Sequence, residues 1–205
     1  MKAGWLAAFC AFAIAVMFTW TELRTSKYPN TGFLIRWSKP FWAYCLTYGF
    51  IALAGFWLFD LLVRNGQLKV EGLGLESAYI RALVIGLSSK AIMQLNLFTV
   101  TSGSTSFPIG IKTVVQLFEP FLLRLIDLDE FNGVREFVAP YAARFPNLDQ
   151  VKAMVKQNIP ASFSQGERTA FQNEIDKETQ VHEAMERFLR FLGKRTFVRV
   201  FGSKR

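Results

Sequence analysis

The stretch that decides the fold is the apolar run AGWLAAFCAFAIAVMFTWT at residues 3–21, which is followed by a second run, PFWAYCLTYGFIALAGFWLF, at residues 40–59. Roughly 20 apolar residues, each rising about 1.5 Å along a helix, cover the hydrocarbon core of a bilayer. Trp5, Trp20 and Trp57 lie near the ends of these runs, where aromatic rings favour the headgroup level. The runs therefore predict a transmembrane hairpin over residues 1–63, with spans at about 3–21 and 40–63.

The composition limits the kinds of site that the protein can hold. The chain has 205 residues, a formal charge of +8 and 51% hydrophobic residues, which exclude a disordered chain. One His and two Cys exclude a multi-ligand His/Cys metal site and a disulfide framework. We therefore expect no bound metal and no cofactor.

The first run also resembles a secretory signal, because Lys2 precedes it. It ends in the bulky residues Met17, Phe18 and Trp20, without a small-x-small cleavage site. We therefore expect an anchor that is not cleaved. Alanines in the first run and glycines in the second allow close helix contact, which suits a hairpin or a homo-oligomer.

Two later stretches, residues 78–100 and 107–126, are apolar but carry charges such as Lys90 and Glu119. A central charge costs about 2.5–3.5 kcal/mol on insertion scales. We therefore expect a helical core over 64–163 that is soluble or abuts the membrane, with breaks at Pro108 and Pro120. The alternative is a second transmembrane hairpin over 78–126, which would give a four-helix, channel-like protein with Lys90 and Glu119 inside the bundle.

The basic residues give two indications about orientation. The loop at 22–39 carries four basic residues and one Glu, so it favours the cytoplasm, but the residues after the second run are basic too. A form with three spans satisfies both groups. The prediction that we carry forward has an internal amino terminus, two spans and a cytosolic carboxy-terminal region.

The carboxy-terminal part predicts helices. Residues 133–145 and 151–158 have helical patterns, and Asp127, Asp129 and Glu130, which lack the spacing of a calcium loop, predict a solvated turn. Ser164 and Glu167 fit a capping box that begins one long amphipathic helix.

His182 lies on the apolar stripe of that helix and is the only histidine in the sequence. No nucleophile motif accompanies it, which favours a packing role and a protein that is not an enzyme; the alternative is a membrane-bound enzyme that uses His182.

The loop TSGSTSFPIGIK at 101–112 is the best candidate for a phosphate or nucleotide signal, through Ser104, Thr105, Ser106 and Lys112. It lacks the ending of a P-loop, so a plain connector is the favoured interpretation.

The last 19 residues, 187–205, hold seven basic residues and no acid. These residues are Arg187, Arg190, Lys194, Arg195, Arg199, Lys204 and Arg205, and phenylalanines stand among them. Cations beside aromatic rings suit the surface of an anionic bilayer, so we expect this tail to lie on the membrane rather than to bind nucleic acid directly. The competing interpretation is that TFVRVF, residues 196–201, packs within the protein.

These segments together predict an all-α membrane protein, in which the hairpin at 1–63 precedes a helical core at 64–163 and an amphipathic helix with a basic tail at 164–205. The layout resembles small membrane effectors of bacterial anti-phage systems, and with four spans it is similar to the membrane subunit of the Kiwa defence system. This resemblance implies self-association in the inner membrane, followed by membrane disruption on a signal or by recruitment of a cytosolic partner. The alternative function is a passive anchor for a cytosolic enzyme.

Overall fold

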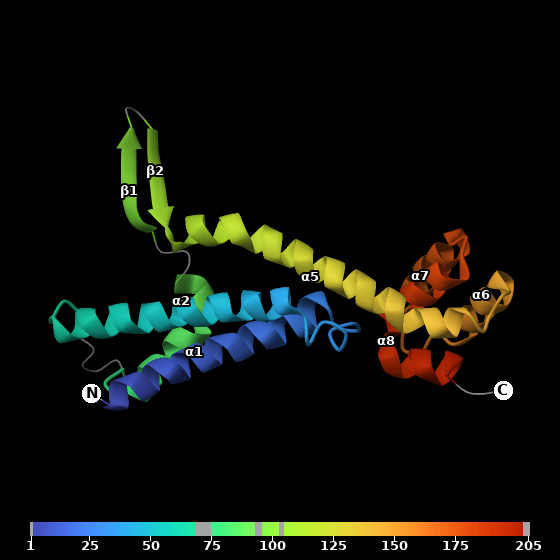
Figure 1. The fold of residues 1–205 in the computed structure, drawn as a ribbon, viewed down its shortest axis with the longest axis horizontal. Coiled ribbons are helices and arrows are strands. Elements are labelled where there is room, and N and C mark those ends of the chain that lie inside the picture. Colours follow the sequence, from blue (N-terminus) through green and yellow to red (C-terminus); the bar gives the residue numbers. More distant parts are fainter. Residues whose placement is uncertain (1, 69–74, 93–95, 103–104, 203–205) are drawn as a thin grey trace. The chain divides into compact units, whose positions relative to one another are not determined.

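The computed structural model describes residues 2–68, 75–92, 96–102 and 105–202, and most of them are helical (Figure 1). The elements are α1 (Lys2–Glu22), a π-helical turn (Leu23–Lys27), α2 (Lys39–Arg64), α3 (Ala78–Leu87), α4 (Ser89–Ile92), β1 (Asn96–Ser102), β2 (Thr105–Gly110), α5 (Ile111–Ala142), α6 (Leu148–Gln157), α7 (Gln165–Lys177) and α8 (Val181–Phe201). The prediction of a mainly helical chain with two apolar helices near the amino terminus is confirmed.

The chain forms two compact units. Unit 1 comprises Met1–Arg24 and Trp37–Ile126, and unit 2 comprises Thr25–Arg36 and Asp127–Arg205. These units do not follow the predicted segments 1–63, 64–163 and 164–205. The division falls inside α5, and the loop between α1 and α2 belongs to unit 2.

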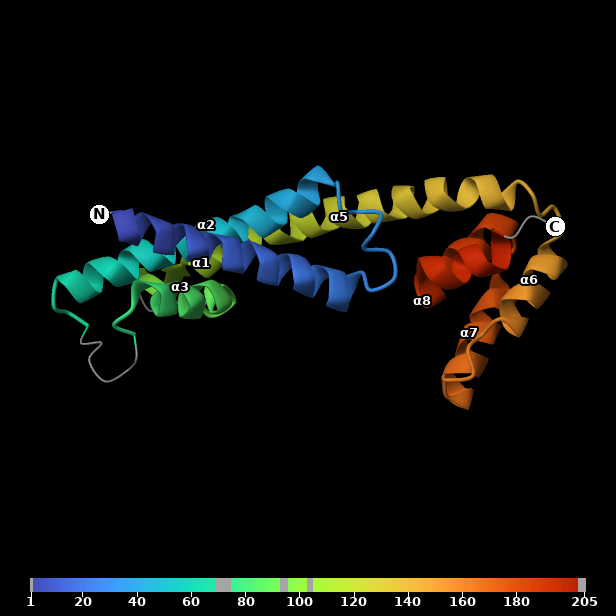
Figure 2. The ribbon, with the colours of Figure 1, turned by 90° about the horizontal axis from the view of Figure 1, so that it is seen from below.

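Small residues bring the helices of unit 1 together. α1 and α2 lie side by side and run in opposite directions, and α3 packs beside α1 (Figures 1 and 2). Ala7, Ala8, Ala11 and Ala15 are fully buried. A Cβ atom on Gly49 would lie 2.6 Å from Val16 Cγ2, so the backbones approach too closely for a larger residue.

Many large apolar side chains of α1 and α2 are exposed. Trp5, Phe9, Met17 and Phe50 are 65%, 64%, 69% and 60% exposed, whereas Phe41 and Phe56 are buried. Among the described residues, two helices, Gly4–Lys27 and Lys39–Arg64, are long and apolar enough to cross a membrane. Unit 1 thus has a packed interior and, outside it, an extensive exposed apolar surface.

The segments at 78–100 and 107–126 differ from the expected helices. The helix expected over 78–100 ends at Leu87, and after α4 the β-branched stretch that begins at Asn96 pairs with β2 in an antiparallel hairpin. The expected break at Pro120 is wrong, because α5 continues through it. Pro120 is exposed, so its ring meets no neighbouring element, and the helix loses one backbone hydrogen bond there.

Unit 2 has a conventional apolar core. Val134, Val155, Ile175, Met185 and Phe188 are fully buried, and they come from the second half of α5 and from α6, α7 and α8. The core joins elements that lie far apart in the sequence, so unit 2 has the packing of an ordinary helical domain.

The loop between α1 and α2 packs on this core. The rings of Phe33 and Phe137 lie 5.5 Å apart, and Asn30 Nδ2 donates to the carbonyl oxygens of Arg190 and Phe191 at 2.8 and 2.9 Å. The loop and the carboxy-terminal region therefore belong to one packed unit. Two helices qualify as spans, and the side of a membrane on which each segment lies stays a prediction.

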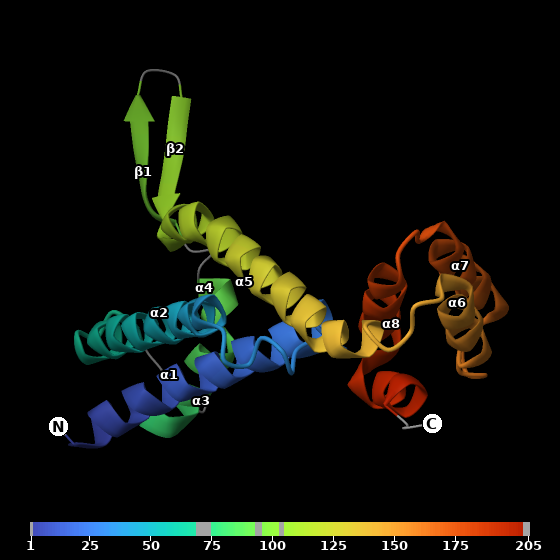
Figure 3. The same ribbon diagram turned by 45° about the vertical axis from the view of Figure 1, so that its right-hand side comes forward.

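The single long helix expected from Ser164 onward is two helices (Figure 3). The capping box of Ser164 and Glu167 is confirmed. α7 ends at Lys177, and α8 then folds back so that the rings of Phe171 and Phe191 stack with centroids 4.0 Å apart. The free energy gained by burying these rings exceeds the free energy that a continuous helix would gain. α8 also bends at Gly193, whose φ of +77° favours glycine.

Substitution of Gly49 tests the close approach of α1 and α2. We expect Gly49→Val to lower the free energy of unfolding by about 1–3 kcal/mol, because the added methyl groups collide with Val16 and Phe12. Ala54→Val is the control, since Ala54 is exposed on the same helix. Thermal unfolding of the purified protein in detergent, followed by circular dichroism, measures both. Equal stabilities of the two variants would contradict the packing.

Candidate functional site

Lys90 and Glu119 were the charges predicted inside the doubtful segments, and unit 1 brings both of them to Tyr48. The hydroxyl of Tyr48 donates to Glu119 Oε1 at 3.0 Å, and Tyr44 donates to the same oxygen at 2.7 Å. Lys90 Nζ lies 5.4 Å from the centroid of the Tyr48 ring and forms an ion pair with Glu22. We call Glu22, Tyr44, Tyr48, Lys90 and Glu119 the polar cluster.

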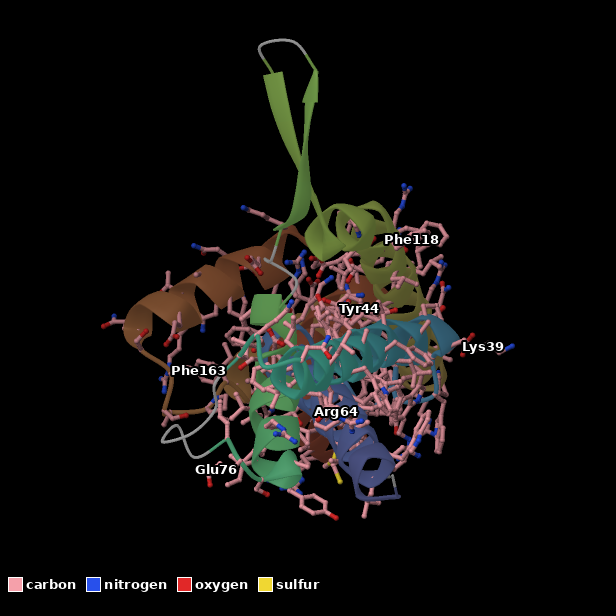
Figure 4. All side chains as sticks on the ribbon, turned by 90° about the vertical axis from the view of Figure 1, so that its left-hand side faces the viewer. Lys39, Tyr44, Arg64, Glu76, Phe118 and Phe163 are labelled. Atoms are coloured by element: carbon pink, nitrogen blue, oxygen red, sulfur yellow. The ribbon has the colours of Figure 1, made fainter. Side chains whose placement is uncertain are left out.

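The spacing on α2 explains why the tyrosines act together. Residues four apart share one face of a helix, and the hydroxyl oxygens of Tyr44 and Tyr48 lie 3.2 Å apart. Figure 4 shows Tyr44 on the side of α2 that faces α5. Both side chains are buried, and a buried hydroxyl without an acceptor costs about 1–3 kcal/mol. The carboxylate of Glu119 supplies that acceptor.

An apolar cavity of about 270 Å³ lies beside the polar cluster. Its lining comes from α2 and α5 and consists of Tyr44, Thr47, Tyr48, Val115, Phe118, Glu119, Phe121 and Leu122. The cavity can therefore hold an apolar group with one polar end against Glu119 and the phenols. The chain of hydroxyls and a carboxylate can also pass a proton, whereas this lining holds no Ser, Cys or His nucleophile.

A second group of charges lies on α2 near the end that is remote from Tyr44. Asp60 is buried and binds Arg64 at 2.7 Å and Arg81 at 3.3 Å. Tyr48 and Asp60 are about 18 Å apart along α2 at a rise of about 1.5 Å per residue. The Asp60 group therefore lies near the carboxy-terminal end of α2, whereas the polar cluster extends to the middle of its apolar run.

The predicted phosphate site is not assembled by the described residues. Ser104 lies outside them, and the side chains of Thr105, Ser106 and Lys112 do as well. The backbone of Thr105 and Ser106 belongs to β2, opposite Ser102 and Thr101, and Lys112 is the second residue of α5. The stretch is a β-hairpin that continues into a helix, and phosphate binding there stays a prediction.

The predicted membrane tail is part of the core of unit 2. Phe188, Phe197 and Phe201 are buried, so the prediction that these phenylalanines insert into lipid is wrong. The helical period of α8 places them on one face against α5 and α6. The competing interpretation, packing within the protein, is confirmed, although residues 196–201 form a helix and not a strand.

The basic residues of this segment have different surroundings. Arg187 binds Glu174 at 2.9 Å and also Glu178, and Arg190 binds Glu130 at 3.0 Å. Lys194 Nζ lies 4.9 Å from the centroid of Phe33. Arg195 and Arg199 are exposed, and Lys204 and Arg205 lie outside the described residues. Contact of the exposed cations with anionic lipid stays a prediction.

The acidic group 127–130 does not form the predicted turn, because it lies within α5. Asp127 accepts hydrogen bonds from Tyr28 and from Lys27, the latter at 3.2 Å. Burial acts to raise the pKa of Asp127, but these two donors lower it below its usual value. Burial and the bond to Asp127 raise the pKa of Tyr28. These acids therefore bind the loop at 25–36, and Glu130 binds α8.

No group of His, Cys, Asp or Glu within the described part of the chain could hold a metal ion. His182 is half-buried in the first turn of α8, where its charge acts on Glu186.

Sequence reasoning missed Tyr44, Tyr48 and Glu22 as members of a site, and also the group at Asp60. Two signals could have found them. Tyrosines four residues apart stand inside an apolar run, and Asp60 with Arg64 form an i,i+4 pair at its end. Comparison with protein-family models, curated proteins and solved structures finds no match to this chain.

Replacement of Glu119 tests the polar cluster. We expect Glu119→Leu to lower the free energy of unfolding by about 2 kcal/mol or more, because two buried hydroxyls lose their acceptor. Glu136→Leu, at an exposed position of the same helix, should have little effect. Unfolding in mixed detergent micelles measures both. In the Glu119→Leu background, Tyr44→Phe should lower the free energy of unfolding by less than it does in the wild type. An equal decrease in both backgrounds would show that the two groups do not interact.

Proposed function

We propose that the protein is an oligomeric inner-membrane sensor and effector, in which unit 1 lies in the bilayer and unit 2 responds to a signal or partner in the cytosol. The observation that carries the proposal is the exposed apolar surface of unit 1. α1 and α2 approach closely at alanines and glycines, and many of their Trp, Phe, Leu and Met side chains are exposed. Lipid is the solvent in which this arrangement is favourable, because apolar side chains cost nothing there and small residues let helices pack closely.

The outward apolar face continues over the rest of unit 1. Ile80, Leu83 and Leu87 of α3 and Phe118 and Phe121 of α5 are exposed. An apolar surface that covers four helices exceeds the scattered apolar residues of a soluble monomer. Charges, in contrast, are concentrated in the Asp60 group near the end of α2 and in the polar cluster, where each charge has a partner within unit 1.

Unit 2 supports a specific topology. Because the loop at 25–36 packs with 127–205, both lie on the same side of the membrane. Between Arg64 and Asp127 the chain must then cross once more. The segment Ala78–Ile92 suits this crossing, since Arg81 binds Asp60 near the carboxy-terminal end of α2 and Lys90 binds Glu22 at the carboxy-terminal end of α1.

The crossing segment is shorter than a standard span. α3 is about 15 Å long, and α4 follows a break at Ser88, so the bilayer would thin around this segment while Arg81 and Lys90 extend toward the headgroups. Both the loop and unit 2 are basic, which favours the cytoplasm for them and an external amino terminus.

The effector role depends on the polar cluster. Ionisable groups inside a membrane unit are typical of proton and ion pathways, and Glu119, the tyrosines and Lys90 form a connected path beside an apolar cavity. The resemblance in layout to anti-phage membrane effectors extends the proposal to a defence role, in which a signal at unit 2 opens this path.

A passive anchor for a cytosolic enzyme is the second candidate, and one observation favours it. Asp60, Lys90 and Glu119 each have a partner within unit 1, so these charges stabilise the bundle without any further role. The two candidates differ in what happens to the membrane potential.

Measurement of membrane potential distinguishes them. Cells that express the protein with its flanking genes are challenged with phage and followed with a potential-sensitive dye. The effector predicts depolarisation with the wild type, a reduced response with Glu119→Gln, and a wild-type response with Glu136→Gln. Glu119→Gln keeps an acceptor for the tyrosines and removes only the charge.

A stable potential in the wild type under overexpression and phage challenge would remove the effector role. Purification from the same cells tests the anchor, which predicts one stoichiometric cytosolic protein in the preparation. A lone homo-oligomer would contradict it.

A further inference from the structure

Unit 2 contains an acidic cleft that the proposed function does not use. It has a volume of about 460 Å³ and lies between α7 and α8. Its lining consists of Phe171, Glu174, Glu178, Glu183, Glu186, Arg187, Arg190 and Phe191. Four carboxylates stand against two guanidinium groups, so the cleft has an excess of two negative charges. The volume falls within the range of roughly 300–1,000 Å³ that is typical of ligand sites.

Both arginines of the lining already pair with glutamates. Arg187 lies between Glu174 and Glu178, and it satisfies both of these carboxylates. The guanidinium of Arg190 forms two hydrogen bonds to Glu130 on α5, at 3.0 and 3.2 Å. Glu183 and Glu186 therefore carry the excess charge.

Glu186 is the residue that points to a ligand. Its side chain lines the cleft, and the residue is only 7% exposed, yet within the described part of the chain it has no hydrogen bond or ion pair. Burial raises the pKa of Glu186, although Arg190, His182 and Arg135 act in the opposite direction. The carboxylate oxygens are not among the fully buried side-chain atoms that lack a partner, so they are open to the cleft, where a cation can pair with them.

The aromatic wall narrows the chemistry of the ligand. Phe171 and Phe191 stack with an interplanar angle of 9°, and Phe163 stacks on the other side at 5.0 Å. Phenylalanine rings attract cations and pack against planar guanidinium groups. The glutamates of this cleft form no group that could hold a metal ion. An organic cation with an apolar stem therefore fits better than an ion.

We propose that the cleft binds a guanidinium group on an aliphatic stem, with Glu186 and Glu183 accepting its N–H groups and the stem lying against Phe171 and Phe191. The group can come from an arginine of a partner protein or from a free arginine-like compound. The cleft lies wholly within unit 2, so the inference holds whether or not unit 1 enters a bilayer. In a membrane sensor, it would be the place where the cytosolic signal enters.

Calorimetric titration of the full chain in detergent tests this site. Two probes carry the guanidinium: arginine amide, and the acetylated, amidated peptide Ala-Ala-Arg-Ala-Ala. Citrulline amide is the neutral control, because it has the same shape without the charge. We expect both charged probes, or one of them, to bind at least tenfold more tightly than citrulline amide. Tighter binding of the peptide identifies a partner protein, and equal binding identifies a small molecule.

Two variants complete the test. Glu186→Gln should weaken binding at least tenfold while the melting temperature stays equal, since Glu186 forms no hydrogen bond or ion pair that the variant would lose. If Glu186 had only a structural role, Glu186→Gln would instead lower the melting temperature. Glu136→Gln is the matched control and should bind as the wild type. The site is refuted if neither charged probe binds at millimolar concentration, or if Glu186→Gln binds as tightly as the wild type.

Discussion

The close approach of α1 to α2 and α3 through alanine and glycine is the constraint on which unit 1 depends. Where Gly49 meets Val16 and Phe12, and where Gly86 meets Ala11 and Ile14, no larger residue fits. Phe12, Val16 and Ile14 of α1 fill the space beside these glycines, and many other aromatic and aliphatic side chains of the two helices stay exposed. The small residues therefore bring the backbones together and leave an apolar exterior, which is the arrangement that suits packing in lipid.

Unit 2 follows the opposite rule and buries its phenylalanines in a core. The loop at 25–36 is also part of unit 2, because Tyr28, Asn30 and Phe33 contact residues of α5 and α8. In the proposed topology, the loop lies on the same side of the membrane as the unit that contains it. The proposed third crossing depends on this packing of the loop.

The sequence predicted the parts that depend on local pattern. The apolar runs, the capping box at Ser164 and the helix near Val151 were all visible in residue spacing. The location of the basic segment could not be predicted from spacing, because interleaved phenylalanines and cations suit both a lipid surface and one face of a buried helix. Nor could spacing reveal that Lys90 and Glu119 meet at Tyr48, since contacts between α2, α4 and α5 depend on tertiary packing.

The most direct measurement is cysteine labelling with a membrane-impermeant maleimide, in a background with Cys10 and Cys45 replaced by alanine. Single cysteines are placed at Ser26 in the loop, at Asn173 on α7, and at Phe9 on the outer face of α1, which are all exposed. The account predicts that Ser26→Cys and Asn173→Cys react in inverted vesicles and not in intact spheroplasts, and that Phe9→Cys reacts in neither. Labelling of the first two from opposite sides, or of Phe9→Cys from water, would contradict it.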